Sequence, residues 1–273
     1  MGDVRVSVKT KIRIVIFCIC LAVFTFAFVY IVREQMNSQN RQEANAQLAE
    51  EARTLPTDEE QSLEEEQVEN QDEEELLYDP NLEIPIDFAM LQEINPDVHA
   101  WIYIPGTTID YPILQSTGYQ EFYLNHDINR ERNVAGAIFT QDFNSLDFRD
   151  VHTLIYGHNM ADGSKFSILH QYLNGRFMEE HDIIYIYTPR NIFRYQVVYA
   201  VTYDDRHILM SFNFDEDEEY ELFIYSLRNS PNINNHWNPH VTWRVGDSLI
   251  TLSTCTDNVY QRLLIGAILI EKF

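Results

Sequence analysis

Residues Thr251–Cys255 (TLSTC) end an apolar run that starts at Val245 and has the composition of a β-strand. A second apolar run, Leu263–Ile270, follows a short polar loop, and Arg262 stands at its start. Two strands joined by a short loop are usually antiparallel neighbours, so the end of the first and the start of the second share one rim of a sheet. We therefore expect Cys255 and Arg262 to lie close together.

This pair of residue types suits nucleophilic catalysis. A free cysteine has a pKa of about 8.5, and its thiolate is the nucleophile. A nearby guanidinium favours the thiolate or stabilises the oxyanion that its attack creates. Cys255 and Arg262 alone equally fit a buried strand-end cysteine beside an unrelated surface arginine, so both interpretations stay open at this point.

The sequence that precedes this stretch is rich in short apolar runs separated by turn residues such as Pro105-Gly106. Besides the runs before Cys255 and after Arg262, strands are expected at Trp101–Ile104, Ile109–Ile113, Ala135–Phe139, Thr153–Tyr156, Ile183–Tyr187 and Phe193–Tyr203. Helical apolar spacing predicts a helix at Phe88–Ile94 and two helical insertions, Lys165–Leu173 and Glu218–Arg228. Many strands with few helices predict a mostly β fold, a closed or nearly closed eight-stranded barrel.

The net charge of -24 is spread unevenly over the 273 residues and divides the chain into four parts. Residues 1–13 form a basic tail. Residues 14–32 carry no charge and have about the length that a helix needs to cross a membrane. Residues 33–79 are polar and strongly acidic, which predicts an extended or partly helical tether. Residues 80–273 have the composition of a folded domain.

The charges around the apolar segment predict a single-pass membrane anchor with the N-terminus in the cytoplasm and the folded domain outside the cell. A cleaved signal peptide is the alternative, but the apolar core is longer than the usual span of about 7 to 15 residues. Cys18 and Cys20 lie inside this segment, so Cys255 is the only cysteine of the exported part and has no internal disulfide partner. The acidity of the tether argues against nucleic acid as a partner.

His158 has a distinctive position among the nine histidines, because it follows Gly157 and the expected strand Thr153–Tyr156. If this strand and the strand that ends at Cys255 run parallel and side by side, His158, Cys255 and Arg262 project at one rim. A nucleophile, an acid/base group and an oxyanion donor are the set that acyl transfer requires. No CxxC or HExxH motif occurs among the cysteines and the nine histidines, so we expect neither a metal nor a cofactor.

The motifs TLSTC (Thr251–Cys255), YGHNM (Tyr156–Met160) and Arg262 resemble the active-site motifs of sortases. Four further segments resemble class B sortases in particular: Asn95–Val98, Trp101–Thr107, Ile109–Pro112 and Tyr123–Asp127. The resemblance covers about Ile84 to the C-terminus, and the anchor and tether fit a membrane-attached member of the family. It implies a sortase-type β-barrel.

By this resemblance, the chain is expected to be a cysteine transpeptidase of a Gram-positive cell surface. Cys255 would attack the carbonyl that follows the threonine of a C-terminal sorting motif and form a thioacyl enzyme. His158 would protonate the departing amine and later take a proton from the incoming one, and Arg262 would hold the oxyanion. The incoming amine would belong to a cell-wall precursor or to a pilin.

Three more residues are candidates for substrate binding. Ser253 and Thr254 would add contacts near the oxyanion, although strand packing explains them as well, and Asn159 would shape the wall behind His158. Some other sortases hold calcium, but Asp215–Glu219 also fits acids that favour a helix N-terminus, so we predict no metal requirement. Two alternatives remain open: a cysteine protease that hydrolyses the same intermediate, and a non-catalytic module that binds peptides.

Overall fold

The computed structural model of the chain describes residues 8–53 and 83–273. The chain divides into two units, Met1–Leu48 and Ala49–Phe273. Helix α1 (Val8–Ala52) holds the predicted anchor, and its part from Ile16 is long and apolar enough to cross a membrane, with a mean hydropathy of 2.4 in its most apolar window. The basic tail up to residue 7, residues 54–79 of the tether and the first three residues of the predicted folded domain lie outside the described residues.

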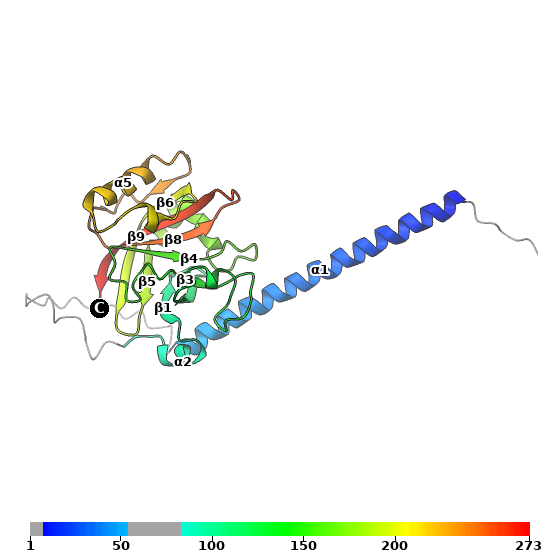
Figure 1. Cartoon of the computed structure of the whole chain (residues 1–273), viewed down its shortest axis with the longest axis horizontal. Coiled ribbons are helices and arrows are strands. Elements are labelled where there is room, and N and C mark those ends of the chain that lie inside the picture. The colour runs from blue at the N-terminus through cyan, green and yellow to red at the C-terminus, as the bar shows by residue number, and fades with distance from the viewer. Residues whose placement is uncertain (1–7, 54–82) are drawn as a thin grey trace, which may run out of the picture. The chain divides into compact units, whose positions relative to one another are not determined.

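The folded unit is built on one mixed sheet that closes into a barrel (Figure 1). Its strands within the described residues are β1 (Val98–Tyr103), β2 (Asp110–Gln115), β3 (Ile138–Thr140), β4 (His152–Tyr156), β5 (Ile183–Tyr187), β6 (Ile192–Asp204), β7 (His236–Trp237), β8 (Leu249–Cys255) and β9 (Gln261–Lys272). Neighbours follow the order β5-β1-β2-β3-β4-β8-β9-β6, and the pairing of β5 with β6 closes the ring. The predicted closed eight-stranded barrel is confirmed. The short β7 is an additional strand, which pairs with Tyr199 and Ala200 of β6.

Short helices lie in the connections between the strands. They are α2 (Phe88–Ile94), η1 (Phe122–Leu124), η2 (Ser167–Leu173), α3 (Gly175–Glu180), α4 (Ile208–Ser211) and α5 (Asp217–Arg228), of which η1 and η2 are 3-10 helices. Helix α2 occupies the range predicted for it, and Asp87 caps its first turn by accepting a hydrogen bond from the Met90 amide at 2.9 Å. The predicted insertion Lys165–Leu173 corresponds to η2, and the predicted insertion Glu218–Arg228 corresponds to α5, while α3 and α4 lie outside both predicted ranges.

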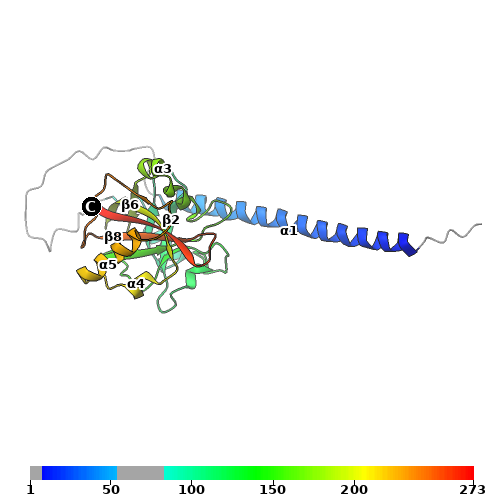
Figure 2. The same ribbon diagram turned by 90° about the horizontal axis from the view of Figure 1, so that it is seen from above.

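Apolar side chains form two cores, one on each face of the barrel wall. Inside the barrel, residues such as Ile155 and Leu252 pack with the buried residues of η2. On the outer face, Phe223 and other buried residues of α5 cover Leu154 and Leu264. Figure 2 shows α5 lying along the barrel beside β8. Because side chains alternate along a strand, the two cores fix which residues of β4, β8 and β9 point inward and which point outward.

Several element ends differ from the sequence prediction, each for a local reason. Strand β8 starts at Leu249 and not at Val245, because Arg244 and Asp247 close a turn in which Gly246 has a φ of 86°. Strand β3 starts at Ile138, since Gly136 approaches the carbonyls of η1 so closely that a Cβ would lie 2.5 Å from the nearer oxygen. These turns depend on tertiary contacts, which apolar runs do not reveal.

The end of α1 is part of the folded unit. Ala52 is fully buried, and its carbonyl accepts a hydrogen bond from the amide of Asp87 at 2.8 Å. The Arg53 guanidinium pairs with Asp110 at 2.7 Å and lies over the Tyr103 ring, 4.9 Å from its centre. The charge pattern assigns Ala52 and Arg53 to the tether, because an ion pair across 57 residues leaves no local signal.

Candidate active site

The strand register brings the predicted residues to one end of β4, β8 and β9. Cys255 is the last residue of β8 and lies directly opposite Arg262 in the antiparallel ladder with β9. Strand β4 runs parallel to β8 on its other side, with Tyr156 opposite Ser253. The pairing continues beyond β4, because the amide of Gly157 donates to the Ser253 carbonyl at 3.1 Å. His158 therefore comes level with Cys255.

Cys255 carries an exposed free thiol. Side chains directly opposite each other in an antiparallel pair lie on the same face, with Cβ atoms about 4.5–5.5 Å apart. The guanidinium of Arg262 therefore projects on the same face of the barrel wall as the thiol. The carbonyl of Cys255 accepts a hydrogen bond from Nε2 of His170 at 3.1 Å, which ties the end of β8 to η2.

His158 is half-buried, and its Nε2 lies 2.6 Å from the carbonyl oxygen of Leu124 in η1. A carbonyl oxygen only accepts, so Nε2 carries a hydrogen in this arrangement, and Nδ1 is the nitrogen that can exchange a proton. The backbone carbonyl of His158 in turn accepts from the amide of Phe166 at 2.9 Å. Gly157 permits this path, because a Cβ there would lie 2.6 Å from Ile138 and from Phe166.

Arg262 is held by the loop between β8 and β9. Its Nη1 donates to the carbonyls of Val259 and Gln261 at 3.1 and 2.9 Å. Burial raises the pKa of Tyr156, and the positive charge of Arg262 acts in the opposite direction. Among the residues that the structure describes, no carboxylate pairs with Arg262, so its charge is available to an anion that forms beside Cys255.

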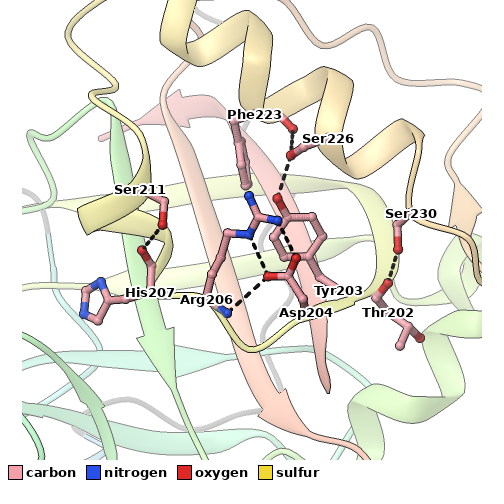
Figure 3. Close-up of polar contacts among 9 residues, drawn as sticks. All are labelled: Thr202, Tyr203, Asp204, Arg206, His207, Ser211, Phe223, Ser226 and Ser230. Atoms are coloured by element: carbon pink, nitrogen blue, oxygen red, sulfur yellow. Dashed lines mark hydrogen bonds and ion pairs between the residues drawn. The ribbon is translucent and has the colours of Figure 1, made fainter. Parts of the chain in front are cut away.

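Strand β6 is the other neighbour of β9, and the charged residues at its end, Asp204 and Arg206, pair with each other (Figure 3). Tyr203 lies opposite Arg262 in the β6–β9 ladder, and its hydroxyl shares a 2.7 Å hydrogen bond with Ser226 of α5. The Arg206 guanidinium lies over the Tyr203 ring, 5.3 Å from its centre, and pairs with Asp204 at 2.5 Å. The hydrogen bonds from Arg206 lower the pKa of Asp204, which keeps this ion pair formed. Arg206 is thus neutralised locally, unlike Arg262.

The three substrate-binding candidates have different surroundings. Ser253 lies two residues before Cys255 and so on the same face, and its side chain is buried. Thr254 alternates to the inner face with Leu252, and its buried Oγ1 has no hydrogen-bond partner among the described residues. Asn159 follows His158 and forms an isolated bridge with Lys165, which closes the loop behind the histidine.

The thiol, imidazole and guanidinium are neighbours without being a bonded triad. Within residues 83–273, no hydrogen bond or ion pair joins the side chains of Cys255, His158 and Arg262. Each is instead oriented by a backbone carbonyl or by the ladder. Because the Cys255 thiol is exposed, a peptide carbonyl can approach it with a proton donor on one side and a cation on the other.

Comparisons with known proteins agree with this geometry. A family model for the sortase domain matches residues 102–270. The sortase B of Staphylococcus aureus (strain NCTC 8325 / PS 47) is 36% identical over 172 residues, which are 62% of this chain and 68% of that protein. The sortase B of Listeria monocytogenes serovar 1/2a (strain ATCC BAA-679 / EGD-e) is 34% identical over 197 residues, 70% and 77% of the two chains. A solved sortase B-substrate complex of S. aureus is similar with a TM-score of 0.59 at 32% identity, covering 67% of this chain and 84% of that one. The chain belongs to the sortase family.

Sortases are cysteine transpeptidases of the cell surface, and the relatives of this sortase are of class B. The predicted family, class and enzyme type are therefore confirmed. The apolar part of α1 suggests a membrane anchor, which fits an enzyme of the cell surface.

Two contacts of this sortase were missed by the sequence reasoning. The Leu124 carbonyl, which holds His158, belongs to a segment that was noted only as a family motif. His170 lies within the predicted helical insertion Lys165–Leu173 and was given no role there, yet its ring reaches the Cys255 carbonyl. A polar residue on an otherwise apolar helical face is the one signal that could have drawn attention to it. In the described part of this sortase, no group of three or more His, Cys, Asp or Glu side chains is arranged to hold a metal.

Proposed function

We propose that Cys255 is the nucleophile of this sortase, with His158 as its acid/base partner and Arg262 as its oxyanion donor. The observation that carries the proposal is the register, which sets Arg262 opposite Cys255 on β9 and brings His158 level with it beyond β4. The exposed thiol and the unpaired charge of Arg262, within the described residues, add support.

In the first half-reaction, the Cys255 thiolate attacks the carbonyl carbon that follows threonine in a sorting motif. The carbonyl oxygen becomes an oxyanion, which the Arg262 guanidinium stabilises. When the intermediate collapses, the carbon–nitrogen bond breaks, His158 gives its proton to the departing amine, and a thioester remains on Cys255.

In the second half-reaction, an amine of a cell-wall precursor or a pilin attacks the thioester. It gives a proton to His158, and the thiolate of Cys255 leaves, which restores the starting state. The substrate protein is thereby joined to the cell-wall precursor or pilin through a new amide bond. A solved S. aureus sortase B has been obtained as a complex with its substrate, which supports a substrate-binding role for this site.

Ser253, Thr254 and Asn159 are proposed to contact the sorting motif. Ser253 shares the face of Cys255, and Asn159 closes the loop behind His158, so both border the place where the peptide would lie. Thr254 faces inward, and its unpartnered Oγ1 would become accessible only through a small shift of the strand end.

The apolar part of α1 is proposed to cross the membrane once, with the N-terminus in the cytoplasm and the barrel outside. The basic residues that precede it and the enzyme's place at the cell surface support this orientation.

The test uses the full chain in detergent micelles, a panel of threonine-containing sorting-motif peptides, and an added amine. Intact mass should show a thioacyl adduct that is absent from Cys255→Ala and that moves to the amine. Arg149→Ala, an exposed arginine on the β3–β4 connection, is the control and should keep the wild-type yield. Resolution of the adduct by water alone, whatever amine is supplied, would favour a cysteine protease, and failure to form any adduct would favour a peptide-binding module.

A further inference from the structure

His170 is a second histidine at the Cys255 site, and it comes from a different element than His158. It lies on η2, which is fixed by the fully buried side chains of Leu169 and Tyr172. The Tyr172 hydroxyl adds a 2.6 Å hydrogen bond to the carbonyl of His181, just beyond α3. The imidazole of His170 is therefore presented from a rigid base, and its Nε2 lies 3.1 Å from the Cys255 carbonyl oxygen.

The Cys255 carbonyl stands where the β8–β9 ladder gives way to a loop. Residues 257–260 of this loop are exposed. The side-chain hydrogen bonds that the structure shows for Thr256 and Asn258 stay inside the loop. In the described residues, the contact with His170 is thus the hydrogen bond that ties this turn to another part of the barrel.

The orientation of a carbonyl fixes the backbone dihedral ψ of its own residue and the plane of the peptide that follows. Holding the carbonyl of a strand-end residue therefore limits the movement of its Cα, and with it the movement of the side chain. The Leu269 amide donates to the Ser248 carbonyl, and bonded pairs alternate along the antiparallel ladder, so Cys255 and Arg262 are a pair without hydrogen bonds between their backbones. The Cys255 carbonyl therefore has no partner on β9. A carbonyl oxygen only accepts, so Nε2 of His170 carries the hydrogen. Without that donor, the peptide after Cys255 is free to rotate with the exposed loop.

We propose that His170 is a positioning residue of this sortase, whose Nε2–H holds the Cys255 carbonyl and thereby aims the thiol at the substrate carbonyl. The inference rests on the proposed role of Cys255 as the nucleophile. It assigns His170 no contact with the reacting atoms. The ring also borders a cavity of about 490 Å³ together with Asn174 and Arg176, so water reaches the side chain and a replacement of similar size does not have to enter the core.

The test compares two substitutions of His170 in the full chain in detergent micelles. His170→Gln keeps an N–H donor at a similar reach, whereas His170→Phe keeps the ring volume and removes the donor. His240→Phe, at an exposed histidine in the β7–β8 connection, is the matched control. The first readout is the rate of iodoacetamide alkylation at Cys255, separated from Cys18 and Cys20 by peptide mass. The second is the kcat and KM of peptide transfer to an amine.

For His170→Phe, we expect a loss of about three- to tenfold in kcat and in alkylation rate, the scale of one hydrogen bond, with KM unchanged. His170→Gln should recover at least half of the wild-type rate, and His240→Phe should match the wild type. Equal losses in His170→Phe and His170→Gln, or a wild-type alkylation rate in His170→Phe, would overturn the inference. Alkylation needs no substrate, so a sortase that fails to transfer any peptide would refute the proposed function and still test His170.

Discussion

The parallel pair β4 and β8 carries a histidine near a hydroxyl or thiol at each of its two ends, and the two ends behave differently. At one end, His152 is 2% exposed, and its Nε2 lies 2.8 Å from Oγ1 of Thr251. Phe214 and Phe223 pack against the imidazole. At the other end, His158 is half-buried and Cys255 is exposed, and no hydrogen bond joins their side chains within the described residues.

The difference teaches that burial, and not residue type, decides what such a pair does. Burial lowers the pKa of His152 to about 3, which keeps the ring neutral at any physiological pH. Thr251 also shares a 2.8 Å hydrogen bond with the Tyr199 hydroxyl, so the buried end is a polar network of three side chains. Nδ1 of His152 is buried without a hydrogen-bond partner among the described residues. His158 keeps one ring nitrogen for proton exchange and lies beside an open rim. The buried end should serve stability and the open end catalysis.

The strongest test of this contrast is His158→Ala. We expect kcat of peptide transfer to fall about a thousandfold, within the usual range for loss of a general acid/base group, with the free energy of unfolding nearly unchanged. His152→Ala is the matched substitution at the buried end and should show the reverse: a loss of stability, with kcat of the folded fraction near the wild-type value. Steady-state kinetics and urea unfolding measure both. The contrast fails if His152→Ala impairs kcat as much as His158→Ala does.

The second test is Arg262→Lys, which keeps the charge at the open end and removes the planar pair of donors. We expect kcat to fall about a hundredfold, the scale of one lost oxyanion donor. Arg206→Lys is the control, because Arg206 follows the end of β6 that lies beside Arg262 but is paired with Asp204. The kcat of Arg206→Lys should stay within about twofold of the wild-type value. A wild-type kcat for Arg262→Lys would mean that charge alone suffices and that no guanidinium geometry is used.

More of the side-chain arrangement could be predicted from the sequence at the open end of β4 and β8 than at the buried end. Apolar runs located β4, β8 and β9, and the short loop between β8 and β9 predicted that Cys255 and Arg262 share a rim. His158 joins them because β4 and β8 run parallel and side by side, which the sequence prediction had to assume. The sequence could not indicate that His152 bonds Thr251, because that contact spans 99 residues and depends on the parallel register.

Contacts made by connections were equally invisible. The hydrogen bond from His170 to the Cys255 carbonyl spans 85 residues, and that from His158 to the Leu124 carbonyl spans 34. Each joins a side chain to a backbone carbonyl, and every residue has one, so the acceptor leaves no mark in the sequence. Short helices such as α3 were missed for a different reason, since six residues are too few for a clear apolar period.

The third test measures the pH dependence of stability at the buried end. The folded-state pKa of His152, about 3, lies below the unfolded value of about 6.5, so between these values the unfolded chain binds one proton more. Stability from this residue is therefore present above about pH 6.5 and is lost as pH falls, by about 1.4 kcal/mol per pH unit. Burial lowers the pKa of His99 to about 4, so His99 makes the free energy of unfolding depend on pH in the same direction, over a shorter pH range.

His152→Gln isolates the contribution of the buried end, because the amide can keep the hydrogen bond to Thr251 and cannot titrate. Its free energy of unfolding should depend less steeply on pH than that of the wild type, by about 1.4 kcal/mol per unit between about pH 6 and 4. Urea unfolding followed by tryptophan fluorescence reports the barrel alone, since the three tryptophans, Trp101, Trp237 and Trp243, all lie in it. Parallel slopes for wild type and variant would mean that His152 is protonated in the folded barrel. Burial would then not be what separates the two ends of β4 and β8.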